Sequence, residues 1–372
     1  MSTCTGEIKS KNITLVLTHQ CNLNCTYCYE HHKNGATMPF ALARDIIEDE
    51  LTRDDGTTLV EFDLFGGEPL LEFETVKAIV DYFKVREYDK DYIFFITTNG
   101  VLLNEERKAW LRKNTEHLQM GLSLDGTKAM HDRNRSDSFD DIDLAFFRDT
   151  YPLESVKMTI SRETLPDLAE GVIFCHEQGF EVSCNLAYGI DWDNEENQRI
   201  FERELALLVD YYIAHPAVKP AAILDINRIK SLAEEHETVR YCGAGHAMRA
   251  YDCDGTFYPC QFFLPICVGE EAAKRALTLD FSAGRIKESQ LDEACKTCFI
   301  RNVCPTCYGN NYATTGDIDR RDMRLCNLNK IQFKAIAYFA AKRFEHGQDG
   351  GFSKADMAAI LKAALALMGA LQ

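Results

Sequence analysis

The chain has 372 residues, fifteen of them cysteine, and a net charge of −17 at pH 7. This length is sufficient for a large α/β domain and a smaller second domain. The negative charge argues against nucleic-acid binding, which depends on basic surface, and no apolar run reaches the length of a membrane span. Because no signal peptide is evident, we expect a cytoplasmic protein whose cysteines are thiols or metal ligands rather than disulfides.

Short apolar runs alternate with helical patterns over the first half of the chain. The runs that we expect to be strands are residues 13–18, 59–65, 92–97, 118–124, 156–160 and 180–186. The helical patterns cover residues 40–51, 73–86, 104–114, 139–149, 165–178 and 195–214. Near-continuous apolar strands are typical of parallel sheets that are covered on both faces, and right-handed crossovers close such strands into a barrel. We therefore predict an α/β fold with a partial (βα)6 barrel at residues 1–214.

The second half of the chain is organised differently. We expect a bridging region at 215–240, a cysteine-rich domain at 241–330 and terminal helices at 331–372. Within the cysteine-rich domain, Asp254 and Gly255 lie between two aromatic runs and predict the turn of a β-hairpin over residues 251–258.

Three cysteines directly follow the first predicted strand. Cys21, Cys25 and Cys28 have CxxxCxxC spacing, so three thiolates could hold three irons of a four-iron cluster and leave the fourth iron open to a small molecule. A zinc knuckle is the alternative, but zinc sites usually have four protein ligands in paired CxxC spacing. The spacing and its position after a strand favour the iron–sulfur cluster.

These residues resemble the cluster loop of the radical S-adenosylmethionine (SAM) enzymes. In that family the open iron binds SAM, and reductive cleavage of SAM gives a 5′-deoxyadenosyl radical. The resemblance implies that Tyr27 packs against the cluster and the adenine. Gly66, Gly67 and Glu68 end the second strand and resemble the family's GGEP motif, in which the glutamate meets the amino group of SAM.

Two further motifs end the third and fourth strands, where parallel barrels build their sites. Thr98 and Asn99 belong to a TNG motif, which in the family contacts the ribose. Ser123 begins an SLDG motif and Arg135 ends an HDxxR motif, and the resemblance implies that both hold the SAM carboxylate. Asp125 is either a further contact or the cap of a turn.

A second group of cysteines lies in the last third of the chain and resembles a SPASM domain, which carries up to two auxiliary [4Fe-4S] clusters. By this resemblance, one outer cluster has four ligands: Cys295, Cys298, Cys304 and Cys326. One inner cluster has three: Cys242, Cys260 and Cys307. Taken alone, the paired CxxC units would also fit a zinc ribbon.

The sequence departs from the SPASM pattern at the inner cluster, where one cysteine of the sulfatase-maturating members is missing. Either Cys253 or Cys267 completes the ligand set, or one iron is open, and we favour the open site. The remaining cysteines, Cys4, Cys175 and Cys184, are expected to be free thiols.

SPASM members mostly act on peptides or proteins, so we expect a peptide maturase that forms a thioether or carbon–carbon crosslink in a ribosomally made peptide. Sulfatase-maturating enzymes, which make formylglycine, carry an aspartate after the cysteine that matches Cys260, but here Gln261 follows. Formylglycine formation is therefore the alternative, with a small-molecule radical SAM reaction or a non-catalytic scaffold as further alternatives. The catalytic base is not identified.

The expected partners follow from the same resemblance. They are a precursor peptide or protein, a flavodoxin or ferredoxin as electron donor, and in some cases a separate leader-binding protein. Only about a dozen residues precede the first strand, which is too few for an N-terminal leader-binding module. A peptide could add a strand at the 215–240 bridge or at the edge of the 251–258 hairpin.

Overall fold

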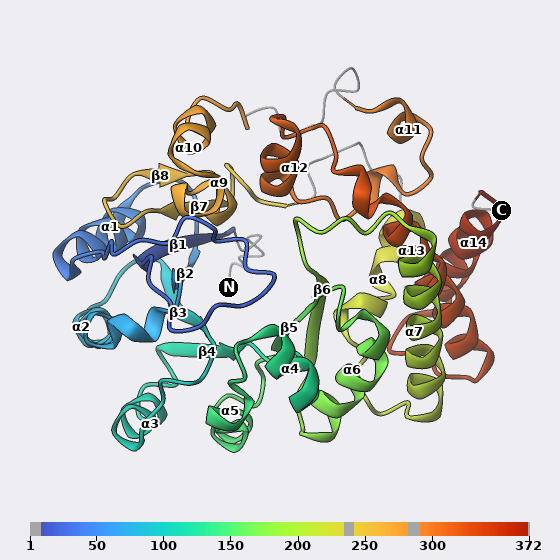
Figure 1. Ribbon diagram of the computed structural model, residues 1–372, viewed down its shortest axis with the longest axis horizontal. Helices are drawn as coiled ribbons and strands as arrows, with labels where there is room; N and C mark the ends of the chain where they lie inside the picture. Colours follow the sequence, from blue (N-terminus) through green and yellow to red (C-terminus); the bar gives the residue numbers. More distant parts are fainter. Residues whose placement is uncertain (1–8, 234–241, 282–290, 371–372) are drawn as a thin grey trace, which may run out of the picture.

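The computed structural model describes residues 9–233, 242–281 and 291–370, so Cys4 and part of the predicted bridge lie outside the described residues. Its first half is a partial barrel of parallel strands with the helices on the outside (Figure 1). The strands are β1 (Ser10–Thr18), β2 (Leu59–Gly66), β3 (Asp91–Thr98), β4 (Leu118–Leu122), β5 (Val156–Ile160) and β6 (Val182–Leu186). All six predicted strands are present, and the predicted α/β barrel is confirmed.

The strands form two parallel sets. The first runs in the order β4-β3-β2-β1, and β5 pairs with β6 in the second. A single parallel bridge between Ser123 and Lys157 joins the two sets. Because β1 has a strand on each side and helices behind it, its residues Ile13 to Thr18 are buried almost without interruption.

The helices around the barrel follow the prediction with two differences. They are α1 (Phe40–Thr52), α2 (Phe73–Phe83), α3 (Glu105–Arg112), α4 (Lys128–Asn134), α5 (Leu144–Thr150), α6 (Leu168–Glu177) and α7 (Glu195–Ala214). The helix predicted over 139–149 begins later, because Asp143 caps α5 by accepting a hydrogen bond from the Phe146 amide. Helix α4 carries the HDxxR motif and was not predicted, because seven residues are too few to show helical periodicity.

The predicted hairpin exists, but its place in the fold was not expected. It consists of β7 (Met248–Tyr251) and β8 (Phe257–Tyr258), with Gly255 in the turn at a φ of +84°. β7 pairs in parallel with β1 on the edge opposite β2. The cysteine-rich region therefore extends the barrel sheet, and this pairing fixes it against the barrel.

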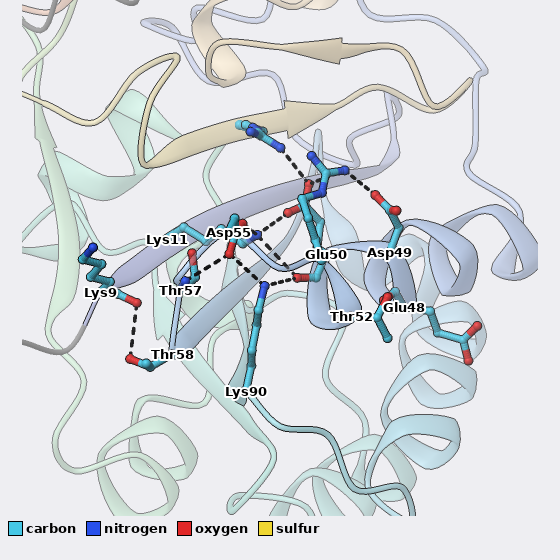
Figure 2. A network of polar contacts seen from close by, with 12 residues as sticks. Lys9, Lys11, Glu48, Asp49, Glu50, Thr52, Asp55, Thr57, Thr58 and Lys90 are labelled. Atoms are coloured by element: carbon cyan, nitrogen blue, oxygen red, sulfur yellow. Dashed lines mark hydrogen bonds and ion pairs between the residues drawn. The ribbon is translucent and has the colours of Figure 1, made fainter. Parts of the chain in front are cut away.

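A buried network of charged side chains near the start of β1 stabilises this junction (Figure 2). Glu50 of α1 is fully buried and pairs with Lys11 of β1 at 2.5 Å and with Arg249 of β7 at 3.2 Å. The Tyr251 hydroxyl also donates to Glu50, at 2.7 Å. The Asp55 carboxylate forms ion pairs with Lys11 at 2.7 Å and with Lys90 at 3.0 Å. The network thus links α1, β1 and β7.

The rest of the chain is helical apart from loops. It contains α8 (Asn227–Ala233), α9 (Pro265–Val268), α10 (Glu270–Ala276), α11 (Glu293–Lys296), α12 (Tyr308–Thr315), α13 (Cys326–Glu345) and α14 (Lys354–Ala370). Helix α13 packs against α7 and α14, and α8 packs against α14 (Figure 1). The described part of the predicted bridge is a loop followed by the short turn Ala222–Leu224 and α8, and it contains no strand whose edge a peptide could extend. No helix in the described ranges is both long and apolar enough to cross a membrane.

Candidate active site

The sequence motifs meet in one cavity of about 370 Å³ at the carboxyl ends of the barrel strands. Its lining includes every residue of the two predicted sets, which are the three cysteines of the first loop and the eight candidate SAM contacts. These residues are Cys21, Cys25, Cys28, Tyr27, Gly66, Gly67, Glu68, Thr98, Asn99, Ser123 and Arg135. Residues more than 100 positions apart in the chain are thus neighbours, because parallel strands bring their carboxyl ends to one edge.

The two glycines after β2 allow the loop that bears the cysteines to approach closely. The Gly67 amide donates to the Thr18 carbonyl at 3.0 Å, and the Glu68 amide donates to the Gln20 carbonyl at 2.8 Å. A Cβ atom at Gly66 would lie 2.4 Å from the Thr18 oxygen, and one at Gly67 would lie 2.3 Å from the Gln20 oxygen. Any larger residue would push the chain leading to Cys21 away from the cavity.

The environment of the three cysteines suits a bound cation. Burial raises the pKa of Cys21 to about 11 and also raises the pKa of Cys25. The Lys33 ammonium lies 3.2 Å from the Cys28 sulfur. Buried thiols with raised pKa values become thiolates only when positive charge is supplied, as a metal cluster does. The three thiols and the glycine-lined cavity therefore fit the expected cluster.

Glu68 connects the loops after β2 and β3. It is buried, and its carboxylate accepts hydrogen bonds from the Thr98 hydroxyl at 2.7 Å and the Asn99 amide at 2.9 Å. The Asn99 side chain in turn donates to Asn22 of the cysteine loop at 2.8 Å. Burial raises the pKa of Glu68, against the effect of these donors. The sequence identified the GGEP motif, the TNG motif and the cysteine loop separately, and the structure shows that hydrogen bonds join them.

Asp125 has the same organising role after β4. It is fully buried, and it accepts from the Tyr27 hydroxyl at 2.6 Å and the Thr159 amide at 2.9 Å. It also pairs with Arg135 at 2.9 Å. The Arg135 guanidinium lies 5.4 Å from the centre of the Tyr27 ring. The sequence suggested that Asp125 makes a further contact or caps a turn. In the structure its side chain instead positions Arg135 and Tyr27 at the wall of the cavity.

Several polar residues of this cavity were missed by the sequence reasoning. Lys157 of β5, Asn185 of β6 and Glu30 of the cysteine loop line it, and burial raises the pKa of Glu30 to about 7. Lys157 is the one charged residue of the predicted strand 156–160, and that charge was the available signal. Glu30 follows the last cysteine of the loop with no motif around it.

The outer cysteine set also converges. Cys295, Cys298, Cys304 and Cys326 line one small cavity, together with Cys307. Burial raises the pKa values of Cys295, Cys304 and Cys326, and Arg321 opposes this effect at all three. The described residues contain no disulfide, so all of these thiols remain available as ligands.

The inner set is less complete. Cys242 and Cys307 line a cavity of about 230 Å³, and the buried Cys260 interacts electrostatically with both. The Cys253 thiol donates to the Val16 carbonyl at 3.2 Å, and the Cys267 thiol donates to the Gln261 carbonyl at 3.2 Å. Neither of these two thiols lines the cavity that Cys242 and Cys307 share.

The spacing of the sulfur atoms argues against zinc. Zinc holds thiolates at about 2.3 Å in a tetrahedron, so its sulfurs lie roughly 4 Å apart. Within the described ranges, one set of three potential ligands has all its ligand atoms within 4.8 Å, and it is His19, Asp252 and Cys253. Among the described residues, no set of three cysteines has all its sulfur atoms within that distance, so none is already arranged for a single zinc ion.

Within this compact set, His19 and Asp252 form a hydrogen-bonded ion pair. Nε2 of His19 lies 2.6 Å from Asp252 Oδ1, and Nδ1 lies 3.0 Å from the Asn34 side-chain oxygen. Although burial lowers its pKa, hydrogen bonds to Asp252 and Cys253 raise the pKa of His19 to about 10. In the protonated form both ring nitrogens donate, and the imidazolium links the end of β1 to the β7–β8 turn.

Comparison with known proteins gives consistent results. A family model described as the Radical SAM superfamily matches residues 15–203. The radical SAM cyclopropyl synthase TigE of Paramaledivibacter caminithermalis is 26% identical over 199 residues, or 48% of this chain and 41% of that protein. The cysteine-type anaerobic sulfatase-maturating enzyme of Clostridium perfringens is 30% identical over 124 residues, or 32% of this chain and 33% of that enzyme. The matches span less than half the length of these relatives.

Two solved structures are similar over most of the chain. The structure of anSMEcpe with bound AdoMet has a TM-score of 0.69 at 18% identity and covers 91% of this chain and 99% of that one. SuiB of Streptococcus suis, bound to its precursor peptide SuiA, has a TM-score of 0.58 at 16% identity and covers 85% of this chain and 76% of that one. The arrangement of a partial barrel followed by a cysteine-rich region is therefore shared with both.

Proposed function

Because this chain belongs to the Radical SAM superfamily, we propose that it is a maturase that crosslinks a ribosomally made peptide. The observation that carries the proposal is the reaction cavity, which is the 370 Å³ cavity at the strand ends. Its lining joins the three-cysteine loop and the candidate SAM contacts to Phe262 of the cysteine-rich region. Similarity of fold to anSMEcpe with the Cp18Cys peptide and to SuiB with SuiA supports a peptide as the substrate.

Cys21, Cys25 and Cys28 are proposed to hold the cluster to which SAM binds. Bound there, the cluster and SAM would supply one-electron reductive chemistry that gives a 5′-deoxyadenosyl radical for hydrogen abstraction from the substrate. The protein's own contribution is position. Gly66 and Gly67 keep the cysteine loop close, and Asp125 fixes Arg135, which we propose holds the SAM carboxylate.

The remaining SAM contacts are proposed from the same wall. Glu68 would meet the amino group of SAM, Thr98 and Asn99 the ribose, and Ser123 the carboxylate, with Tyr27 packing beside the adenine. All of these side chains line the reaction cavity. Their mutual hydrogen bonds preorganise the wall, so little reordering would accompany SAM binding.

We propose two auxiliary [4Fe-4S] clusters. The four converging thiols around the 30 Å³ cavity support a fully ligated outer cluster. Cys242, Cys260 and Cys307 would hold the inner cluster. Cys253 and Cys267 each donate to a backbone carbonyl, and neither lines the cavity that Cys242 and Cys307 share, which supports an open iron at that site.

The bond formed is proposed to be a thioether or a carbon–carbon crosslink. Formylglycine formation is the second candidate, supported by similarity to the cysteine-type sulfatase-maturating enzyme. Against it, Gln261 occupies the position expected for the catalytic aspartate, and its side-chain oxygen is buried with no hydrogen-bond partner in the described structure. An amide at this position cannot accept a proton as a carboxylate would.

The proposed partners are the precursor peptide, a flavodoxin or ferredoxin that supplies electrons, and in some systems a separate leader-binding protein. The edge of β8 supports a docking place for an extended peptide, because β8 pairs with β7 alone and Phe257 is exposed. We propose a cytoplasmic location on the ground that no disulfide joins any two of the described cysteines.

Iron content and EPR spectra of anaerobically reconstituted protein test the cofactor assignment. Wild type should hold about twelve irons, and the Cys21→Ala, Cys25→Ala, Cys28→Ala triple variant about eight with no SAM cleavage. About four irons together with bound zinc would contradict the auxiliary clusters.

Mass spectrometry of a short peptide encoded beside the gene tests the reaction: loss of two hydrogens supports a crosslink, and conversion of cysteine or serine to an aldehyde supports formylglycine. Turnover of small molecules alone would contradict both.

A further inference from the structure

Tyr188 occupies a junction between three cavities. It follows the end of β6 and lines the reaction cavity, the 230 Å³ cavity beside Cys242 and Cys307, and an outer cavity of about 440 Å³. Among the described residues, no other side chain lines all three. The segment Asn185 to Tyr188 is thus the partition between the place of SAM chemistry and the proposed inner cluster.

The ring of Tyr188 is held by a built aromatic group. It meets Phe262 edge to face, with centroids 5.3 Å apart, and Phe262 stacks on Tyr29 at 4.2 Å. Phe262 can lie there because α12 presents Gly309, where a Cβ atom would come within 2.2 Å of the Phe262 Cβ. Tyr29 and Phe262 line both the reaction cavity and the outer cavity. The aromatic group therefore fixes the direction of the Tyr188 hydroxyl.

That hydroxyl reaches a predicted cluster ligand. Burial raises the pKa of Cys307 to about 11, and hydrogen bonds from the Asn310 and Gly309 amides and from the Tyr188 hydroxyl oppose this rise. Cys307 lies at the start of α12 and lines both the 230 Å³ cavity and the small cavity of the outer cysteine set. Hydrogen bonds to cluster sulfurs are one of the means by which a protein sets a cluster's reduction potential.

We propose that Tyr188 is a positioning residue that sets the potential of the inner auxiliary cluster from the wall of the reaction cavity. This inference rests on the proposed function, because it requires the auxiliary cluster. An O–H donor stabilises negative charge on the Cys307 sulfur, and the reduced cluster carries more of that charge than the oxidised one. Tyr188 therefore raises the potential of the inner cluster, and a change in the cavity wall reaches the cluster through one hydrogen bond.

The test uses the Cys21→Ala, Cys25→Ala, Cys28→Ala variant, which should retain only the auxiliary clusters, as the background for Tyr188→Phe. This substitution removes the hydroxyl and keeps the ring, so the aromatic packing is preserved. The matched control is Tyr312→Phe, because Tyr312 lines only the outer cavity and gives its hydroxyl to the Ala272 carbonyl at 2.8 Å. Iron content and an EPR-monitored redox titration are measured for each protein.

We expect Tyr188→Phe to keep about eight irons and to shift the midpoint of one cluster to a more negative potential. The other cluster and the Tyr312→Phe control should not change. Identical midpoints in Tyr188→Phe and the background would overturn the proposal, as would loss of iron, which would give the hydroxyl a role in assembly instead. If the background itself lacks auxiliary iron, the proposed clusters fail, and that failure is recognised before Tyr188 is tested.

Discussion

At the scale of single residues, Asp125 shows how a buried carboxylate organises a binding wall. Its carboxylate accepts hydrogen bonds from the Tyr27 hydroxyl and the Thr159 amide and forms an ion pair with Arg135. Two side chains that we expect to contact SAM are thus positioned by Asp125, which need not contact SAM itself. Arg135 is itself buried, and pairing with Asp125 keeps its pKa raised although burial acts in the opposite direction. The arginine thus depends on Asp125 for both its charge balance and its direction.

We expect Asp125→Asn to weaken SAM binding by at least about tenfold and to destabilise the fold by about 3–5 kcal/mol, because it leaves a buried guanidinium without its counter-ion. Calorimetric SAM binding and chemical denaturation of the reconstituted enzyme measure the two effects. Asp140→Asn is the control, since Asp140 is exposed and pairs only with Lys128. Its effect should stay below about 1 kcal/mol. Unchanged SAM affinity in Asp125→Asn would rule out the positioning role.

Asp63 of β2 gives a prediction about pH. Its Oδ1 atom is buried without a hydrogen-bond partner, and burial raises its pKa from 3.8 to about 7. Between these values the folded state binds a proton that the unfolded state has lost, so stability falls as pH rises through this range. Asp63→Asn should therefore be close to wild type in stability near pH 4 and exceed it by up to about 4 kcal/mol at pH 8, where a shift of about three pKa units is fully expressed. Equal thermal midpoints at both pH values would contradict this.

At the scale of elements, the barrel and the cysteine-rich region share a sheet. The pairing of β7 with β1 is supported by Glu50, which connects α1 to Lys11 of β1 and to Arg249 of β7 (Figure 2). Lys11 and Lys90 hold the pKa of Asp55 well below its usual range, although burial acts to raise it. The ion pairs among Glu50, Asp55 and their lysine and arginine partners thus form one connected network.

Glu50→Gln should destabilise the protein by about 3–5 kcal/mol, because Lys11 stays buried with one partner fewer. The expected loss is concentrated at the β1–β7 junction, so amide exchange of residues 248–251 should accelerate more than that of β3. Asp49→Asn serves as a comparison: it removes an exposed ion pair with Arg53 and should cost less than about 1 kcal/mol. Equal effects of the two variants would show that burial of the network is unimportant.

At the scale of the whole molecule, the apolar core is unevenly distributed. One large cluster of buried residues runs through the barrel and its helices, and a second surrounds the β7–β8 hairpin and α12. Near the outer cysteines, the separate cluster consists of Leu291 and Cys295 with Met323 packed against it. So small a cluster contributes little to the order of the chain around Cys295, although Ile300 and Val303 belong to the large cluster. We therefore expect bound metal to supply part of the stability here.

Removal of iron with a chelator should therefore loosen the segment around Cys295 to Cys326 and leave the barrel folded. Hydrogen exchange measured by mass spectrometry should show faster exchange at residues 291–326 and unchanged protection in β1 to β4. Equal protection with and without iron would mean that the outer cysteines need no metal to hold their arrangement. General loss of protection would mean that the barrel also depends on the clusters.

The sequence by itself determined the barrel and predicted which motifs lie at the ends of its strands. Apolar runs define the strands because both faces are buried, and motifs at strand ends must share one edge of the sheet. Only the tertiary structure decided the pairing of β7 with β1, the organising role of Asp125 and the junction at Tyr188. Each depends on contacts between segments far apart in the chain, for which local periodicity and spacing carry no signal.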